Sequence, residues 1–187
     1  MLFHCLDFAN VGFVTVFSFG GFVLRAHRRP VAAVARVEAR ASAGLAQSER
    51  RFRSVEGLVF EHRDVMAQPE LPSNSADVVL CLSLTKWIHL HHGDEGIRRL
   101  FAHIRSTLRP GGLLFLEAQS FASYKKKKRK MTQAMKEMLQ TIRLLPEEGF
   151  IPYLCDNLGF KLLEELNPKS ESKGFQRPIW KLQKATE

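Results

Sequence analysis

Two apolar runs that flank an amphipathic helix constrain the fold of this chain more than any other feature. The run DVVLCLSL, residues 77–84, and the run LLFLE, residues 113–117, are almost continuously apolar, as in parallel strands covered on both faces. From Asp94 to the helix-stopping RPGG at 109–112, the apolar side chains fall on one helical face: Ile97, Leu100, Phe101, Ile104 and Leu108. The order strand, helix, strand predicts a right-handed parallel crossover, and therefore an α/β protein.

Length and composition indicate one globular domain. The 187 residues allow one ordinary domain, or a short version of a larger one, at about 150 residues per domain. Hydrophobic residues make up 45% and charged residues 25%, which excludes a disordered or fibrous chain. Cys5, Cys81 and Cys155 form neither a disulfide framework nor a metal-ligand spacing, which favours a reducing compartment.

Other segments extend this pattern on both sides. The sequence predicts the following elements: an amphipathic helix at 31–47, a strand at 57–61, a surface loop at 68–76, helices at 131–142 and 146–158, and an antiparallel pair of strands at 161–166 and 178–184. We expect a mostly parallel sheet that ends in a C-terminal antiparallel hairpin.

Residues 8–24 form an uncharged stretch near the start of the chain. Asp7 precedes the stretch where a signal peptide would carry positive charge, so a signal peptide is disfavoured. The stretch is short for a membrane anchor and contains three glycines, although an anchor stays open as an alternative. Its Val and Phe content favours a buried strand with a glycine-containing turn.

Positive charge is concentrated in the second half of the chain. The formal net charge is +9, of which residues 1–85 carry +1 (nine Arg, eight acids) and residues 86–187 carry +8 (nineteen Lys and Arg, eleven acids). Six consecutive basic residues occupy 125–130. This run is open to three interpretations: a solvated surface, a track for RNA phosphates, or a nuclear localisation signal.

Polar and aromatic residues follow three of the predicted strands. Asp64 follows the first, SLTKWIHLHHGD follows the second and EAQSFASY follows the third. Ligands of open α/β sheets bind outside the carboxyl ends of the strands, so these segments are expected to line one pocket. Trp87 is open to a role in this pocket or in the core.

Several of these residues also invite a metal interpretation. The group consists of Lys86, Trp87, His89, His91, His92 and Asp94. No distant Cys or His completes a tetrahedral set, so solvated loop histidines are favoured over a metal site.

Three motifs carry a resemblance to a known family. LCLSLTKWIHL with GDEG, LRPGGLLFLE and KGFQRP stand in the order found in the bicoid-interacting-protein-3 family of RNA methyltransferases, which the chain resembles over residues 55–184. The resemblance implies a Rossmann-like class I fold that depends on S-adenosyl-L-methionine. Its capping members methylate the 5′ terminal phosphate of an RNA. We therefore expect a methyltransferase domain at 55–187, preceded by an atypical segment at 1–54.

The resemblance also implies roles at the acceptor site. Lys86 would hold the phosphates, and Tyr124 and Gln119 would shape the site, with Lys86 and Tyr124 as the catalytic residues. Phe175 would stack on the terminal base, which is typically worth ~1–3 kcal/mol. Further RNA contacts are expected from Trp87, Lys125, Lys126, Gln176 and Arg177. A phosphate oxygen is already anionic, so the chemistry needs positioning rather than a base.

The methyl-donor site is less complete. Asp64 and Val65 are expected near the adenine, and the backbone at Leu82 is expected to line the donor pocket. The family opens with L-D-x-G-C-N-x-G after its first strand, whereas this chain offers only LDFANVG, in which Asp7, Asn10 and Gly12 are the matching positions. The N-terminal part of the fold is therefore incomplete.

Two functions follow from these motifs. The first is a monomeric, nuclear RNA methyltransferase that acts on the 5′ phosphate of a small RNA, with possible ribonucleoprotein partners and no membrane. The second is a catalytically inactive RNA-binding member of the family, because the donor motif is degenerate.

Overall fold

A computed structural model of the protein describes the second half of the chain almost continuously. Residues 65–66, 72–126, 131–166 and 177–186 are described in full, and three strands at 13–18, 22–27 and 58–62 are described by their backbone. The helix expected at 31–47 lies outside the described residues.

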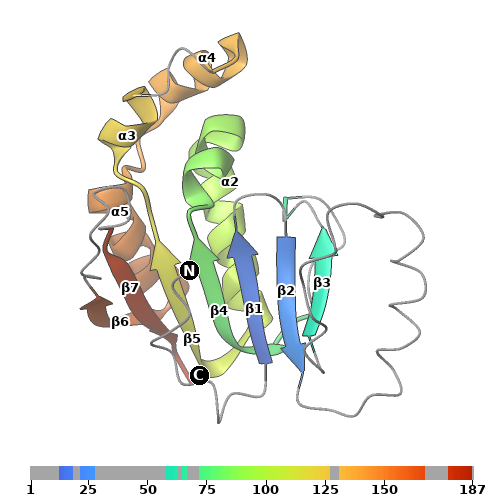
Figure 1. Ribbon diagram of the computed structural model, residues 1–187. Coiled ribbons are helices and arrows are strands. Elements are labelled where there is room, and N and C mark those ends of the chain that lie inside the picture. Colours follow the sequence, from blue (N-terminus) through green and yellow to red (C-terminus); the bar gives the residue numbers. More distant parts are fainter. Residues whose placement is uncertain are drawn as a thin grey trace, which may run out of the picture.

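Seven strands form one sheet in the described part of the chain (Figure 1). Their order is β3-β2-β1-β4-β5-β7-β6. Their bounds are β1 Phe13–Ser18, β2 Phe22–His27, β3 Leu58–His62, β4 Ala76–Leu82, β5 Leu108–Glu117, β6 Phe160–Leu166 and β7 Ile179–Lys184. The strands β1, β4 and β5 are mutually parallel, so their carboxyl ends lie at the same edge of the sheet. The predicted parallel unit and the C-terminal antiparallel hairpin are both confirmed.

The expectation of a mostly parallel sheet is wrong for the described strands, because only β1–β4 and β4–β5 pair in parallel. Three residues, 19–21, join β1 to β2, whereas a parallel crossover needs a dozen or more. The two strands therefore pair antiparallel. They also confirm the strand interpretation of 8–24 for the residues that are described, and none of the described helices is long and apolar enough to cross a membrane.

The helix after β4 begins earlier than its apolar periodicity predicts. Helix α2 spans Thr85–Thr107, and Gly93 interrupts it with φ 64° and ψ −163°. The periodicity from Asp94 predicted only the part beyond this kink. A Cβ atom at position 93 would also lie 2.8 Å from the sulfur of Met138, so the kink and the close approach both favour glycine.

The RPGG segment belongs to a strand rather than to a loop. Strand β5 begins at Leu108, directly after the helix, and includes residues 109–112. A Cβ atom at Gly112 would lie 2.9 Å from the carbonyl oxygen of Arg109 and 3.1 Å from that of Asp77. Glycine is required at position 112 because the neighbouring backbone leaves no room for a side chain.

Four shorter helical segments follow β5 in the part of the chain that the structure describes. They are α3 Phe121–Lys126, α4 Gln133–Thr141, α5 Pro146–Pro152 and the π-helical turn η3 Tyr153–Asn157. The predicted helices at 131–142 and 146–158 are confirmed in these elements, whereas α3 was missed because polar residues and lysines obscure its pattern. In Figure 1, α3 and α4 lie beyond the carboxyl ends of β4 and β5.

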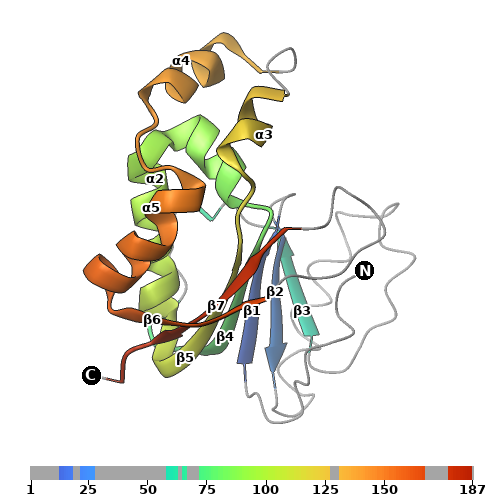
Figure 2. The ribbon, with the colours of Figure 1, turned by 90° about the vertical axis from the view of Figure 1, so that its left-hand side faces the viewer.

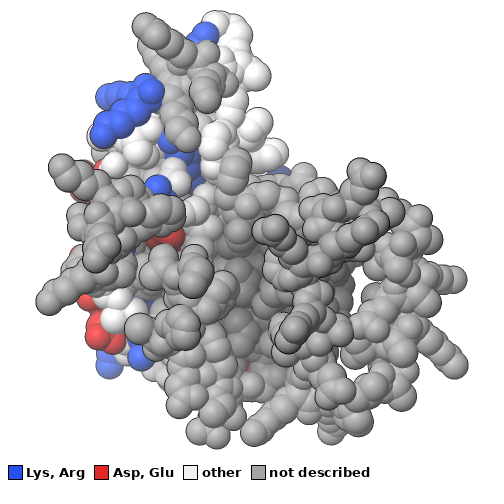
Figure 3. Space-filling model, viewed as in Figure 1, with Lys and Arg blue, Asp and Glu red and all other residues white. Residues whose placement is uncertain are grey.

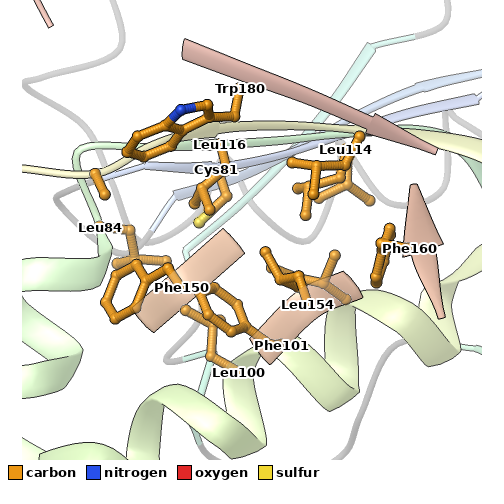
Figure 4. Close-up of a cluster of buried hydrophobic side chains, with 14 of the residues drawn as sticks. Cys81, Leu84, Leu100, Phe101, Leu114, Leu116, Phe150, Leu154, Phe160 and Trp180 are labelled. Atoms are coloured by element: carbon orange, nitrogen blue, oxygen red, sulfur yellow. The ribbon is translucent and has the colours of Figure 1, made fainter. Parts of the chain in front are cut away.

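The main core lies between the sheet and one layer of helices. Helices α2 and α5 cover the same face of the sheet (Figure 2). Phe101 of α2 and Phe150 of α5 contact each other edge to face at 5.2 Å between ring centroids, and face Cys81 and Leu116 of the sheet (Figure 4). Burial, and then the nearby Glu117 carboxylate, raise the pKa of the Cys81 thiol to about 12, so Cys81 is an inert core residue.

A second, smaller core joins the helices beyond the sheet edge. Met135 and Leu139 on the inner face of α4 pack with Leu90 of α2 and Tyr124 of α3. Thr132 caps α4 by accepting a hydrogen bond from the backbone N–H of Met135 at 3.3 Å. This cluster fixes α3 and α4 on the first turns of α2.

Truncation of the aromatic pair tests the main core. Phe101→Ala removes a fully buried ring and leaves a cavity beside Phe150, so we expect a loss of about 3–5 kcal/mol in the free energy of unfolding, measured with urea. Leu163→Ala is the control, because Leu163 is 42% exposed on β6 and its loss is expected within ~0.5 kcal/mol. Equal losses in the two variants would contradict this description of the core.

Candidate functional site

The sheet has a topological switch point between β1 and β4. These strands pair in parallel, with Ser18 opposite Leu82 at their carboxyl ends, and the strands that follow them, β2 and β5, lie toward opposite edges of the sheet. Ligands of open α/β sheets bind at such a point. Leu82 is half-buried there, and the next residue, Ser83, turns the chain with φ 55°. A small-molecule site is therefore expected at this edge.

Lys86 is buried in the first turn of α2, directly beyond this edge. Only 3% of the residue is exposed, and its Nζ donates a hydrogen bond to the carbonyl oxygen of Ser123 at 2.8 Å. The ammonium also lies 5.4 Å from the ring centroid of Tyr124 and 5.9 Å from that of the half-buried Trp87. Aromatic faces attract cations, so three groups hold this charge in place. Trp87 is thus both a neighbour of Lys86 and a wall of the smaller core.

Tyr124 is fully buried in α3. Burial, and then the negative charge of Glu147, raise the pKa of its hydroxyl well above the ordinary value of 10.0. Tyr124 therefore keeps its proton at neutral pH and is not a general base. Within the described structure, the Tyr124 ring contacts the Lys86 ammonium.

His89 was expected to be a solvated loop residue, and this expectation is wrong. It lies on the inner side of α2 with no side-chain exposure, and its Nε2 lies 2.8 Å from Asp94 Oδ1. Its Nδ1 lies 3.4 Å from the hydroxyl of Tyr124. The short helix before Gly93 turns His89 inward and leaves His91 and His92 exposed.

A metal site is not formed by this group. Among the fully described residues, no three His, Cys, Asp or Glu side chains come together in a way that could hold a metal ion. Asp94 instead accepts hydrogen bonds from the backbone N–H groups of Arg143 and Leu144, at 3.0 and 3.1 Å. No pattern in the sequence predicts these backbone partners, which lie 49 and 50 residues further along the chain.

Arg177 reaches the same edge of the sheet from the C-terminal hairpin. Its Nη1 donates to Glu117 Oε1 at 2.6 Å and to Ser83 Oγ at 3.0 Å, and Ser83 donates to the same carboxylate oxygen at 2.9 Å. Glu117 and Ser83 were missed as site residues. The pairing of β5 with β7 places Glu117 opposite Ile179, two residues after Arg177. Opposite charges at these two strand ends are the sequence signal that could have indicated the ion pair.

Three further predicted RNA-contact residues lie on or beside α3. Gln119 is half-buried between β5 and α3, while Lys125 and Lys126 are exposed in the last turn of α3. Lys125 Nζ lies 5.2 Å from the ring centroid of Phe121. Figure 3 shows Lys and Arg side chains gathered over this end of the molecule. Val65 is half-buried against the main core, and six predicted residues lie outside the described ones: Asp7, Asn10, Gly12, Asp64, Phe175 and Gln176.

Comparison with known proteins defines the class of the chain first. A methyltransferase-domain model matches residues 18–116, and a bicoid-interacting protein 3 (Bin3) model matches residues 76–184. Each match covers more than half of the chain. The chain has a methyltransferase domain with a Rossmann-like mixed α/β sheet, and it belongs to the Bin3 family. The resemblance stated from the motifs is confirmed.

Three relatives illustrate the similarity. The human 7SK snRNA methylphosphate capping enzyme is 44% identical over 133 residues, which are 70% of this chain and 19% of that protein. The Drosophila melanogaster U6 snRNA methylphosphate capping enzyme Amus is 37% identical over 126 residues, or 67% of this chain and 41% of that protein. The rat RNA 5′-monophosphate methyltransferase is 31% identical over 96 residues, or 46% and 33%. The chain thus spans between a fifth and two fifths of the length of these relatives.

The burial of His89 predicts a pH dependence of stability. Burial lowers the pKa of His89 below its ordinary value of 6.5, although the Asp94 carboxylate opposes this effect. The unfolded chain therefore binds a proton more readily than the folded one, so stability should be full above pH 6.5 and fall as the pH drops below it. We expect urea denaturation at pH 7.5 and 5.5 to show this loss.

Two variants assign the effect to one histidine. In His89→Gln the loss between pH 7.5 and 5.5 should shrink, because the buried imidazole at position 89 is no longer present to titrate. The exposed His91→Gln should keep the full loss. An unchanged pH dependence in His89→Gln would show that another group causes it.

Proposed function

We propose that this chain acts on the 5′ terminal phosphate of a small RNA as an S-adenosyl-L-methionine-dependent methyltransferase. The observation that carries the proposal is the Bin3 match over 76–184, which includes every described residue that is predicted at the acceptor site: Lys86, Trp87, Gln119, Tyr124, Lys125, Lys126 and Arg177. The printed functions of the relatives support the same chemistry, because two are methylphosphate capping enzymes and one is an RNA 5′-monophosphate methyltransferase.

The described residues fit a donor at the switch point. Leu82 is half-buried at the carboxyl end of β4, and the left-handed turn at Ser83 leads the chain away from the strand end. S-adenosyl-L-methionine, when bound, supplies an electrophilic methyl group on a sulfonium. The backbone at Leu82 would line its site, with Val65 as a second apolar contact.

The residues of this chain would act by positioning. A phosphate oxygen is already an anionic nucleophile, so no group needs to remove a proton, and the protonated Tyr124 is consistent with this. Lys86 is the cation that would hold the terminal phosphate, because its ammonium is fixed by Ser123 and two aromatic rings. Arg177, fixed by Glu117, would bring a second cation from the hairpin.

A specific observation supports a second candidate, an RNA-binding protein without transfer. The LDFANVG motif precedes β1, which begins at Phe13, whereas in the family pattern the motif follows the first strand. This candidate predicts RNA binding without affinity for the donor. Calorimetry with S-adenosylhomocysteine separates the two, because tight binding would argue against the inactive form.

Replacement of Lys86 tests the proposed chemistry. With labelled donor and RNA carrying a 5′ mono- or triphosphate, the wild-type chain should transfer the methyl group to 5′-phosphorylated RNA and not to the same RNA with a 5′-hydroxyl. Lys86→Met keeps an apolar stem and removes the charge, so transfer should fall about 100-fold or more while donor affinity changes little. Lys161→Ala, on exposed β6, is the matched control. Absence of both transfer and donor binding in the wild type would refute the enzymatic proposal.

The exposed lysines at the end of α3 generate a separate prediction. If Lys125 and Lys126 contact RNA phosphates, the double variant Lys125→Ala, Lys126→Ala should weaken single-stranded RNA binding and reduce the slope of log affinity against log salt by about 1.4. Fluorescence anisotropy over a salt series measures this slope. The pair Lys161→Ala, Lys181→Ala on the C-terminal hairpin controls for net charge, and an equal change in both pairs would indicate nonspecific attraction.

A further inference from the structure

A chain of three side chains connects Asp94 to the predicted acceptor site. Asp94 Oδ1 lies 2.8 Å from His89 Nε2, and His89 Nδ1 lies 3.4 Å from the Tyr124 hydroxyl. The two rings meet almost at right angles, with an interplanar angle of 82°. His89 and Tyr124 are both fully buried, so the contact between them excludes water.

Each contact among Asp94, His89 and Tyr124 has a defined donor and a defined acceptor. Burial tends to raise the pKa of Asp94, but the hydrogen bonds from His89 and from the N–H groups of Arg143 and Leu144 outweigh burial and lower it. The carboxylate is therefore ionised and only accepts, which assigns the imidazole proton to Nε2. His89 is neutral because burial lowers its pKa, so Nδ1 accepts. The Tyr124 hydroxyl must then donate its proton inward, to His89.

Donation to His89 determines whether the Tyr124 hydroxyl can also bind a phosphate. A hydroxyl whose proton is directed to His89 has only lone pairs left, and these repel an anionic oxygen. Tyr124 therefore contributes its ring and its position, not a hydrogen bond to the substrate. Lys86 is left as the phosphate-binding group of this pair.

Lys86 is connected to Asp94 and His89 through Tyr124 and its neighbour Ser123. Two adjacent residues of α3 hold its ammonium: the carbonyl oxygen of Ser123 at 2.8 Å and the ring of Tyr124 at 5.4 Å. A rotation of the Tyr124 ring would therefore shift the cation. Asp94 in turn accepts hydrogen bonds from the backbone N–H groups of Arg143 and Leu144, between α4 and α5. The orientation of Tyr124, on α3, therefore depends on α2 and on the segment between α4 and α5.

We infer that Asp94 and His89 are positioning residues, which hold Tyr124 so that its ring and the adjacent Ser123 carbonyl aim the Lys86 ammonium at the RNA phosphate. This inference rests on the proposed function and assigns to it two residues that touch neither substrate nor donor. Because the methyl donor and the phosphate oxygen must be aligned, an error in the direction of Lys86 acts on the rate more than on binding.

Two substitutions of His89 separate positioning from stability. In His89→Asn the side-chain amide lies near the former Nδ1 and can still accept from Tyr124, but it does not reach Asp94. In His89→Gln the amide lies near the former Nε2 and keeps Asp94, but it loses Tyr124. Tyr124→Phe removes only the hydroxyl and keeps the ring over Lys86. The exposed His91→Asn is the control.

The assay uses the full chain, RNA with a 5′ phosphate and labelled S-adenosyl-L-methionine, with thermal melting measured in parallel. We expect kcat to fall about tenfold in His89→Gln and Tyr124→Phe, with the KM for RNA within about twofold, and to fall less in His89→Asn. Stability should follow the opposite order, with His89→Gln more stable than His89→Asn. A purely structural role predicts instead that activity follows stability.

Each outcome decides the inference. If kcat in Tyr124→Phe and His89→Gln stays within twofold of the wild type, or if activity follows stability, the inference is refuted while the proposed function stands. Failure of Tyr124→Phe to fold would also refute it, because the hydroxyl would then be structural. If the wild type neither transfers methyl groups nor prefers 5′-phosphorylated RNA to 5′-hydroxyl RNA, the proposed function fails and the inference fails with it.

Discussion

The parallel pairing of β4 and β5 around α2 is the constraint on which the rest of the structure depends. Because the two strands run the same way, their carboxyl ends, Leu82 and Glu117, are register partners at one edge of the sheet. Everything that follows each strand therefore begins at that edge: α2 with Lys86, and α3 with Tyr124. A right-handed crossover also places α2 against the sheet, where its apolar face completes the main core. The β4–α2–β5 unit therefore both forms the main core and positions Lys86 and Tyr124.

Helix α2, which is kinked at Gly93, contributes to two cores. Phe101 beyond the kink and Ile88 before it pack in the main core, whereas Leu90 joins the cluster formed by α3 and α4. The polar side chains of the site lie at this boundary. His89 contacts Phe150 of the main core at 5.7 Å and Tyr124 of the smaller core at 5.8 Å between ring centroids. A buried imidazole is tolerated there because both of its nitrogens have partners.

Local sequence patterns predicted the strands and most of the helices, because a helix or strand that is buried on one face carries apolar residues at a regular spacing, and a strand buried on both faces is apolar throughout. The same patterns could not predict contacts between distant residues. Lys86 was identified from a motif, but its contact with Ser123, 37 residues away, follows from the approach of α3 to α2. His89 was misinterpreted because three histidines within four residues read as a polar loop, and only the helical geometry shows that one of them points inward. The pairing of Arg177 with Glu117 spans 60 residues and likewise needed the order of the strands.

The mixed sheet places β1 between the antiparallel strands β2 and β3 and the strands β4, β5 and β7, which position Lys86, Tyr124 and Arg177. Strand β1 still pairs in parallel with β4, so the switch point keeps its geometry at Ser18 and Leu82. The antiparallel β2 lies on the side of β1 that faces away from β4. Lys86, Tyr124 and Arg177 are positioned by β4, β5 and β7 and by the helices that follow them. The ammonium of Lys86 and the guanidinium of Arg177 are therefore held by Ser123, Glu117 and Ser83, which lie on or directly beside α3, β5 and β4.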